Sequence, residues 1–221
     1  MPLYRFILDN LDTLLPETAD HVYVVAVTLA VSVLSGLSLG VLAARRQRAG
    51  EAILAIASTM LTIPSFALFA VLTTLFIAVQ VQIGDPPVIV GLVLYAQLPI
   101  IRNTRAGILA VNPSVLEAAR GMGMTPWQVL RKVELPLALP VILGGIRQAT
   151  VMVVAIATVG ATVGSANLGR PILDSLQRSG SRLPIIAGIL FVAVLGLVAD
   201  GLLGGLQRVL GGDRITTEPL T

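Results

Sequence analysis

Five long apolar stretches, separated by shorter polar ones, dominate the pattern along the chain. A helix rises about 1.5 Å per residue, so about 20 apolar residues cross a hydrocarbon core of roughly 30 Å. Each stretch is long enough for one crossing. The pattern therefore predicts an all-α membrane protein with five membrane-spanning helices, at residues 22–44, 52–79, 88–108, 137–159 and 184–209.

Residues 1–20 have a different pattern, in which apolar residues recur at helical spacing and charged residues lie between them. This spacing predicts an amphipathic helix that lies in the membrane interface and ends at Pro16. The segment has no basic start and no small-residue cleavage site after an apolar run, so we do not expect a secretory signal here.

The polar stretch 112–134, between the third and fourth predicted spans, predicts two short helices outside the bilayer. Ser114 is the expected N-cap of the first helix, with Glu117 as its capping-box partner. Thr125 is the expected N-cap of the second, and Pro136 then opens the fourth span. The two helices carry apolar side chains that a solvated loop would not expose. A protein partner is therefore expected, unless the loop packs on itself.

Composition supports the membrane assignment. The chain is 55% hydrophobic and 12% charged, with a mean hydropathy of +0.90, whereas a soluble domain carries roughly 25% charged residues. With no cysteine and a single histidine, His21, the sequence offers no thiolate or histidine-rich metal cluster. We interpret His21 as a polar residue at a helix entrance, with a pH sensor as the alternative.

The basic residues lie mainly in short loops or at the ends of apolar runs, which favours a role in membrane orientation over nucleic-acid binding. One set of loops and span ends holds Arg45, Arg46, Arg48, Arg102, Arg105, Arg120, Arg131, Lys132, Arg208 and Arg214. The other set holds Arg5, Arg170, Arg178 and Arg182. The richer side is expected to be cytoplasmic, which puts the N-terminus outside and the C-terminus inside.

The polar stretch also contains a motif: Glu117-Ala118-Ala119, then Gly121 and Gly123, and then Leu135-Pro136. Its order and spacing resemble the EAA signature of permease subunits of binding-protein-dependent ABC importers. In that family the stretch forms coupling helices that dock into a groove on the ATP-hydrolysing subunit. The resemblance implies that ATPase coupling rests on Glu117, Ala118, Ala119, Gly121, Gly123, Trp127 and Pro136.

The resemblance covers nearly the whole chain and implies a single transmembrane permease domain over residues 1–221. Five spans, with the coupling stretch between the third and fourth, are similar to the small permeases of methionine type. Residues 158–177 look like the glycine-rich loop of the osmoprotectant branch, which takes glycine betaine, choline or carnitine, although Ser165-Ala166-Asn167 stands where a Gly-Gly pair is more usual. A quaternary-ammonium osmoprotectant is the implied solute, with methionine or another amino acid-like solute as the alternative.

The family also implies partners. These are an ABC ATPase subunit that binds ATP and magnesium, an extracytoplasmic solute-binding protein, and a second permease chain that is identical or paralogous. The chain itself is expected to bind no cofactor and to lie in the bacterial cytoplasmic (inner) membrane. Aromatic residues make up only 4% of it, and recognition of a quaternary ammonium usually needs an aromatic cage. High-affinity selection is therefore expected in the binding protein.

The sequence does not favour a nucleotide site within the chain, and a membrane-embedded enzyme and a passive channel are the alternative classes of function. Residues 164–171 nearly match a phosphate-binding loop, but Arg170 replaces its lysine and Pro171 its Ser/Thr. A membrane-embedded enzyme would need clustered ionisable groups, which Arg147 and Asp200 do not supply. These two charges lie within predicted spans, and we expect them to face the bundle interior and form a pair. A passive channel is the third class.

Glycine pairs and prolines mark further features of the spans. Gly36-x-x-x-Gly40 and Gly201-x-x-x-Gly205 predict close helix packing, within the chain rather than at a dimer interface. Asp85-Pro86-Pro87 predicts a turn before the third span, which Pro99 is expected to break.

Pro64 predicts a kink in the second span. Backbone groups freed at such a kink must line a cavity or be buried in protein. The kink therefore marks candidates for the translocation pathway, with a packing kink as an equally good interpretation. These candidates are Met60, Thr62, Pro64, Ser65 and Phe66.

Overall fold

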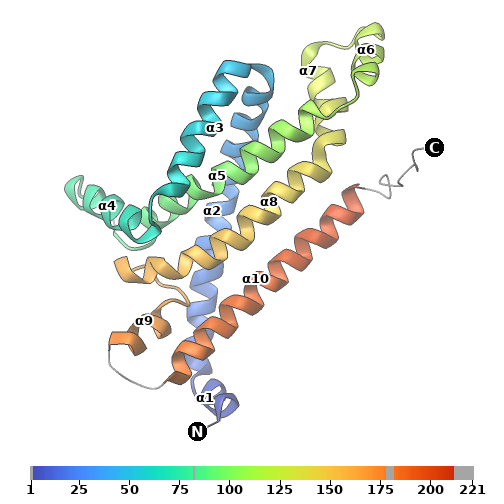
Figure 1. Ribbon diagram of the computed structural model, residues 1–221. Helices are drawn as coiled ribbons and strands as arrows, with labels where there is room; N and C mark the ends of the chain where they lie inside the picture. Colours follow the sequence, from blue (N-terminus) through green and yellow to red (C-terminus); the bar gives the residue numbers. More distant parts are fainter. Residues whose placement is uncertain (1, 82, 178–181, 212–221) are drawn as a thin grey trace.

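The computed structural model describes residues 2–81, 83–177 and 182–211, and every element in this part of the chain is helical (Figure 1). The elements are α1 (Leu3–Asp9), α2 (Leu11–Arg45), α3 (Gln47–Thr62), α4 (Ser65–Ala78), α5 (Asp85–Leu109), α6 (Pro113–Gly121), α7 (Pro126–Val129), the π-helical turn η1 (Leu130–Glu134), α8 (Leu135–Ala157), the 3-10 helix η2 (Thr158–Val163), α9 (Arg170–Gln177) and α10 (Arg182–Gly211). Arg178 and Arg214, which entered the charge comparison, lie outside the described residues.

Four helical segments of the described chain are long and apolar enough to cross a membrane: α2, α5, the rod from α7 to η2, and α10. Helices α3 and α4 pass the same test together, but they are bent by 100°. The all-α membrane fold is therefore confirmed, with four candidate spans, or five if the bent pair counts as one.

Helix α5 lies at the centre of the bundle and packs against α2 on one side and α8 on the other (Figure 1). Its fully buried side chains, Val88, Leu92, Ala96 and Ile100, form much of the main hydrophobic cluster. Two-thirds of its most apolar window (67%) is buried, against 11% for α10, which packs on α8 and α9 at the edge of the bundle. The exposed apolar side chains of α10 suit contact with lipid or with a second protein.

Small residues let α2 approach α5 closely. A Cβ added at Gly36 would lie 2.6 Å from Ile100 Cγ2, and one at Gly40 would lie 2.5 Å from Thr104 Cβ. The predicted packing within the chain is therefore confirmed for this pair. It is wrong for Gly201 and Gly205, because no atom of the described chain comes within 4 Å of a Cβ added at either one.

The N-terminal prediction needs a correction. The first helix, α1, stops at Asp9, and α2 then begins at Leu11 and continues through Pro16 to Arg45. Pro16 is the sixth residue of α2, so it removes one helical hydrogen bond, the one to the Asp12 carbonyl, but α2 continues through it. Leu14 is buried at 2% exposure, and this packing holds the first turns of α2 in place.

The other prolines act differently from expectation. At Pro64 the chain does not merely kink: Ile63 and Pro64 are extended, as a residue before proline favours, and α4 leaves at a large angle. Pro99 does not break α5, because tight packing on neighbouring helices keeps this buried segment helical. Asp85-Pro86-Pro87 is not a turn but the start of α5, where prolines lack no helical hydrogen bond.

Two further boundaries differ from the sequence expectation. The second short helix and the fourth span are one helix, because α7 continues through η1 into α8, with Pro136 as the second residue of α8. The expected loop 160–183 includes most of η2 and all of α9, and its residues 178–181 lie outside the described chain. Helices α6 and α7 and the α2–α3 corner lie at one end of the molecule, and α1 and α9 lie at the other (Figure 1).

Candidate functional site

The predicted coupling stretch folds as a helical hairpin at one end of the bundle (Figure 1). The side chain of Asn112 caps α6 by accepting from the Ser114 N–H at 2.9 Å, and Pro113 is the first helical residue. The prediction that Ser114 is the N-cap, with Glu117 as its capping-box partner, is therefore wrong by two residues. Asparagine and serine are comparable caps, and a proline suits the first helical position, which favours Asn112 here.

Gly123 ends α6 in a left-handed conformation, with φ of +79°. Its N–H donates to the Arg120 carbonyl at 2.9 Å, and the Met124 N–H donates to the Ala119 carbonyl at 3.2 Å. These two bonds are those of a Schellman cap, which needs a residue tolerant of positive φ. Gly123 therefore sets the turn between the two short helices. Gly121 is not in this conformation, and no described atom lies within 4 Å of a Cβ added there.

Thr125 is the N-cap of α7, as the sequence predicts, and it also forms a capping box that the sequence analysis did not predict. The Thr125 hydroxyl accepts from the Gln128 N–H at 3.4 Å, and the Gln128 side chain accepts from the Thr125 N–H at 2.8 Å. Pro126 is the first helical residue. Reciprocal capping of this kind orients a helix that is too short to be stable in isolation.

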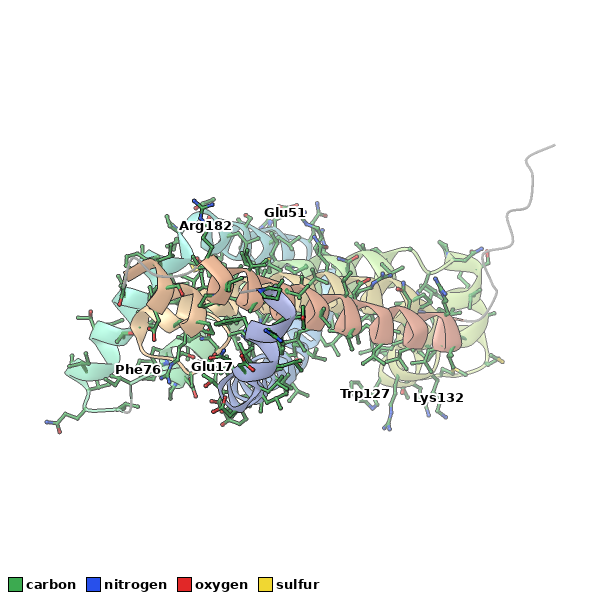
Figure 2. All side chains as sticks on the ribbon, turned by 90° about the horizontal axis from the view of Figure 1, so that it is seen from below. Glu17, Glu51, Phe76, Trp127, Lys132 and Arg182 are labelled. Carbon is green, nitrogen blue, oxygen red and sulfur yellow. The ribbon has the colours of Figure 1, made fainter. Side chains whose placement is uncertain are left out.

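The surface of the hairpin is apolar and exposed. Met122 is 72% exposed and Trp127 is 66% exposed, and Figure 2 shows Trp127 and Lys132 pointing away from the body of the molecule. Of the predicted coupling residues, all but one are exposed: Glu117, Ala118, Gly121, Gly123, Trp127 and Pro136. Ala119 is buried at 2% exposure. Six of the seven predicted coupling residues are therefore accessible in the single chain, and Ala119 is covered.

The base of the hairpin is fixed to the bundle. Val129 and Leu130 are buried, and Leu130 joins a cluster with Ile108, Ala138 and Ile142. The neighbouring Glu134 is buried at 2% exposure and forms an ion pair with Arg45, at the end of α2. Sequence reasoning missed this pair, although a glutamate between a polar stretch and an apolar span is a signal that could have found it.

The pathway candidates lie at the bend between α3 and α4. Thr62, Pro64 and Phe66 are exposed, whereas Met60 and Ser65 are half-buried. The Ile63 carbonyl, which the break in the helix releases, accepts from the Tyr95 hydroxyl at 2.7 Å. Tyr95 thus ties the bend to α5, a contact that the sequence did not indicate.

Arg147 and Asp200 lie on α8 and α10, and the structure brings them together. The guanidinium of Arg147 donates to both carboxylate oxygens of Asp200. The expectation that they face the bundle interior is wrong, because their side chains are 41% and 31% exposed. The pair lies between the two helices, and the single chain leaves one side of the pair uncovered.

The opposite end of the bundle holds a polar network that the sequence did not reveal. The Ser165 hydroxyl donates to Asp85 Oδ1 at 2.7 Å, and the Ala166 N–H donates to the same oxygen at 3.3 Å. Asn167 is fully buried, and its Oδ1 accepts from the Gly169 N–H at 2.7 Å. The residues Ser165-Ala166-Asn167, which stand where a Gly-Gly pair is more usual, therefore fasten this loop to the start of α5.

The same contacts explain why residues 164–171 are not a phosphate cradle. A cradle needs free backbone N–H groups that point at the ligand. Here Asp85 of α5 accepts the Ala166 N–H, and carbonyls of η2 accept those of Gly164 and Ser165. Asn167 accepts the N–H groups of Gly169 and Arg170. A Cβ added at Gly169 would lie 2.0 Å from the Thr158 carbonyl oxygen, so the loop backbone packs tightly against the start of η2.

His21 lies on α2 rather than at a helix entrance, because α2 begins ten residues earlier, at Leu11. It is fully buried, and its Nε2 lies 3.1 Å from the Val154 carbonyl oxygen of α8. The histidine therefore links α2 to α8.

Comparison with known proteins gives consistent matches. Residues 36–210 match the family described as "Binding-protein-dependent transport system inner membrane component". The chain is 40% identical over 210 residues to the osmoprotectant import permease protein OsmW of Salmonella typhimurium, covering 95% of this chain and 97% of that protein. It is also 40% identical over 175 residues to the glycine betaine/carnitine/choline transport system permease protein OpuCD of Bacillus subtilis, covering 79% and 74%.

Solved structures share the fold. A chain of the MetNI methionine ABC transporter in an inward-facing conformation has a TM-score of 0.81 at 22% identity, covering 89% of this chain and 95% of that chain. A chain from an amino acid ABC transporter crystallised with histidines has a TM-score of 0.77 at 18% identity, covering 95% and 99%.

Proposed function

The chain belongs to the family of binding-protein-dependent transport system inner membrane components, and from this premise we propose that it imports a quaternary-ammonium osmoprotectant such as glycine betaine, choline or carnitine. The family consists of transport permease subunits rather than enzymes. One observation carries the solute class: a relative that is 40% identical over 95% of this chain is named for osmoprotectant import. The loop 158–177, which resembles that of the osmoprotectant branch, points the same way.

The proposed mechanism is alternating access across the inner membrane. Two permease chains, identical or paralogous, enclose a central pathway. Two ATPase subunits close on ATP and magnesium and move the coupling stretch of each permease, which opens the pathway outward to receive solute from a binding protein. Hydrolysis then resets the assembly. The chain itself supplies no nucleotide site in this scheme.

The proposed ATPase-docking surface is the exposed face of α6 and α7. Glu117, Ala118, Gly121 and Trp127 supply its charge, its small-residue contacts and its apolar anchor, and Gly123 fixes the angle between the helices. Exposed Met and Trp side chains on a short hairpin support a protein partner, because water does not favour such a patch. Ala119 holds the hairpin together from within.

We propose that this end of the bundle is cytoplasmic and the N-terminal end is outside. Support comes from the charges: Arg46, Arg48, Arg131 and Lys132 lie at the end that carries the coupling stretch. With this orientation α1 lies at the outer interface, and the Asp85–Ser165 network lies where a binding protein would dock.

We propose the bend at Pro64 as part of the pathway. An extended pair of residues interrupts the helix, and Thr62, Pro64 and Phe66 are uncovered in the single chain. Non-helical backbone at membrane depth is tolerated only where it lines a cavity or is buried in protein. A second chain opposite this bend would complete such a cavity.

The second candidate solute is methionine or another amino acid. The fold is shared with chains of a methionine transporter and an amino acid transporter. At identities of 22% and 18%, this likeness does not bear on what is carried. The osmoprotectant class is therefore preferred.

Uptake tests the proposal. The chain is expressed with its ATPase and binding protein in cells that lack their own osmoprotectant importers, and radiolabelled glycine betaine, choline, carnitine and methionine are supplied at high osmolarity. We expect ATP-dependent uptake of at least one quaternary ammonium and no uptake of methionine. Methionine uptake alone would favour the second candidate, and uptake that persists without ATP would favour a passive channel.

A further inference from the structure

An ion pair between a buried carboxylate and a partly exposed guanidinium joins the coupling stretch to a distant part of the chain. Glu134 ends the π-helical turn η1, and both of its carboxylate oxygens accept from the guanidinium of Arg45, the last residue of α2. The Glu134 side chain is 2% exposed. A carboxylate out of water needs a charged partner, so Glu134 is held to the end of α2 wherever the coupling stretch moves.

The π-helical turn explains how Glu134 reaches this position. The Leu135 N–H donates to the Leu130 carbonyl, five residues back, so the turn is wider than that of an α-helix. Such single turns are frequent at functional sites. Here the wide turn lies between the exposed surface of α7 and the apolar rod of α8, and it directs the carboxylate inward while Arg131 and Lys132 stay exposed.

On the other side of the pair, the corner between α2 and α3 is compact. Ala43 is 1% exposed, and a Cβ added at Gly50 would lie 2.5 Å from the Ala43 carbonyl oxygen. The start of α3 is therefore pressed against the end of α2. Helix α3 then runs to the bend at Pro64, whose Ile63 carbonyl is fixed by Tyr95.

We infer that Arg45 and Glu134 are positioning residues that transmit motion from the coupling stretch to the α2–α3 corner, and through α3 to the bend at Pro64. The inference rests on the proposed function, because it assumes that an ATPase moves α6 and α7. Apolar contacts have no direction, whereas a bidentate Arg–carboxylate pair fixes both distance and orientation. Energetic coupling requires such a physical link between elements and a measurement that demonstrates it.

Spin labels test this link without knowledge of the solute. The chain has no native cysteine, so cysteines are introduced at Ser114 on α6 and Ile56 on α3, both at exposed positions. The distance between the labels is measured in the full importer, first without nucleotide and then with magnesium, ATP and vanadate. We expect nucleotide to shift both labels together in the wild-type chain, which keeps the distance distribution narrow.

Four variants are compared with the wild-type chain. Glu134→Gln and Arg45→Gln are expected to broaden the distribution at least twofold with nucleotide and to lower solute transport per ATP hydrolysed, while the ATPase still co-purifies. The swap Arg45→Glu with Glu134→Arg should restore a narrow distribution. Arg48→Gln is the matched control on the same corner and should behave as wild type.

The outcomes separate the link from the proposed function. If Glu134→Gln and Arg45→Gln both keep a narrow distribution and full transport per ATP, the link does not exist. If either variant elutes as aggregate, the swap variant alone decides: a narrow distribution supports the link, and a broad one overturns it. A wild-type chain that co-purifies no ATPase contradicts the proposed function, whatever the variants do.

Discussion

At the scale of single residues, two glycines of the coupling stretch have different structural roles. Gly123 has a φ of +79° and completes the cap at the end of α6. Gly121 has no such conformation, and the described chain leaves the space around it open. The sequence prediction assigned both glycines to ATPase coupling, whereas the structure gives Gly123 a backbone requirement and leaves open space at Gly121.

Replacing Gly123 by alanine is expected to destabilise the turn by about 1 kcal/mol, because an L-residue resists the left-handed conformation. A lower melting temperature of the purified chain and weaker co-purification of the ATPase should follow. Gly121→Ala is the matched control: its melting temperature should be unchanged or higher, with only the ATPase association reduced. Equal melting temperatures for both variants would contradict this assignment.

The Arg147–Asp200 pair allows a second prediction at this scale. Removal of one partner leaves the other charge alone in the span region, so Arg147→Ala and Asp200→Ala should each lower the melting temperature. If the two charges act as a pair, the double variant should cost no more than either single one. Thermal unfolding of the three variants in detergent measures this, and additive losses would show that the residues act independently.

At the scale of helices, the two glycine pairs show how the same motif serves different surfaces. Gly36 and Gly40 allow α2 to contact the buried Ile100 and Thr104 of α5, while Gly201 and Gly205 face away from the described chain. The sequence alone makes these pairs equivalent, because both are small residues four apart in an apolar helix. Only the arrangement of helices decides which one is covered.

Gly40→Ala is therefore expected to destabilise the fold by about 1–3 kcal/mol, the usual range for overpacking. The neighbouring Thr104 is fully buried and has no room to move. Gly201→Ala, the control, should leave the melting temperature unchanged, because the added methyl meets open space. Thermal unfolding of both variants under the same conditions provides the test, and a loss at Gly201 as large as that at Gly40 would refute it.

The helices themselves show what periodicity could predict and what it could not. Long apolar runs located α2, α5, α8 and α10 because the length and composition of a span are local properties. Prolines were less informative. Helix α2 continues through Pro16 and α5 continues through Pro99, whereas the chain bends by 100° at Pro64. The packing around each proline decides which outcome it has.

At the scale of the whole molecule, the coupling stretch was found from its motif, and its capped helices were predicted to within a few residues. Three polar contacts were not predicted, because each joins segments far apart in the sequence. They are the Arg45–Glu134 pair, the Tyr95 contact at the bend and the Asp85–Ser165 network. Long-range polar contacts of this kind leave no periodic signal. The ion pair joins η1 to the end of α2, the Tyr95 contact fixes the bend to α5, and the Asp85–Ser165 network fastens the loop at the far end.

Crosslinking in intact cells tests the central claim most directly. A photoreactive residue is placed at Met122 or Trp127 on the coupling stretch, and, as the control, at the equally exposed Tyr4 on α1. In cells that make the whole importer, positions 122 and 127 should crosslink to the ATPase subunit and Tyr4 should not. Crosslinks from 122 and 127 that reach only lipid, or labelling of these positions by a membrane-impermeant reagent added outside, would contradict the account.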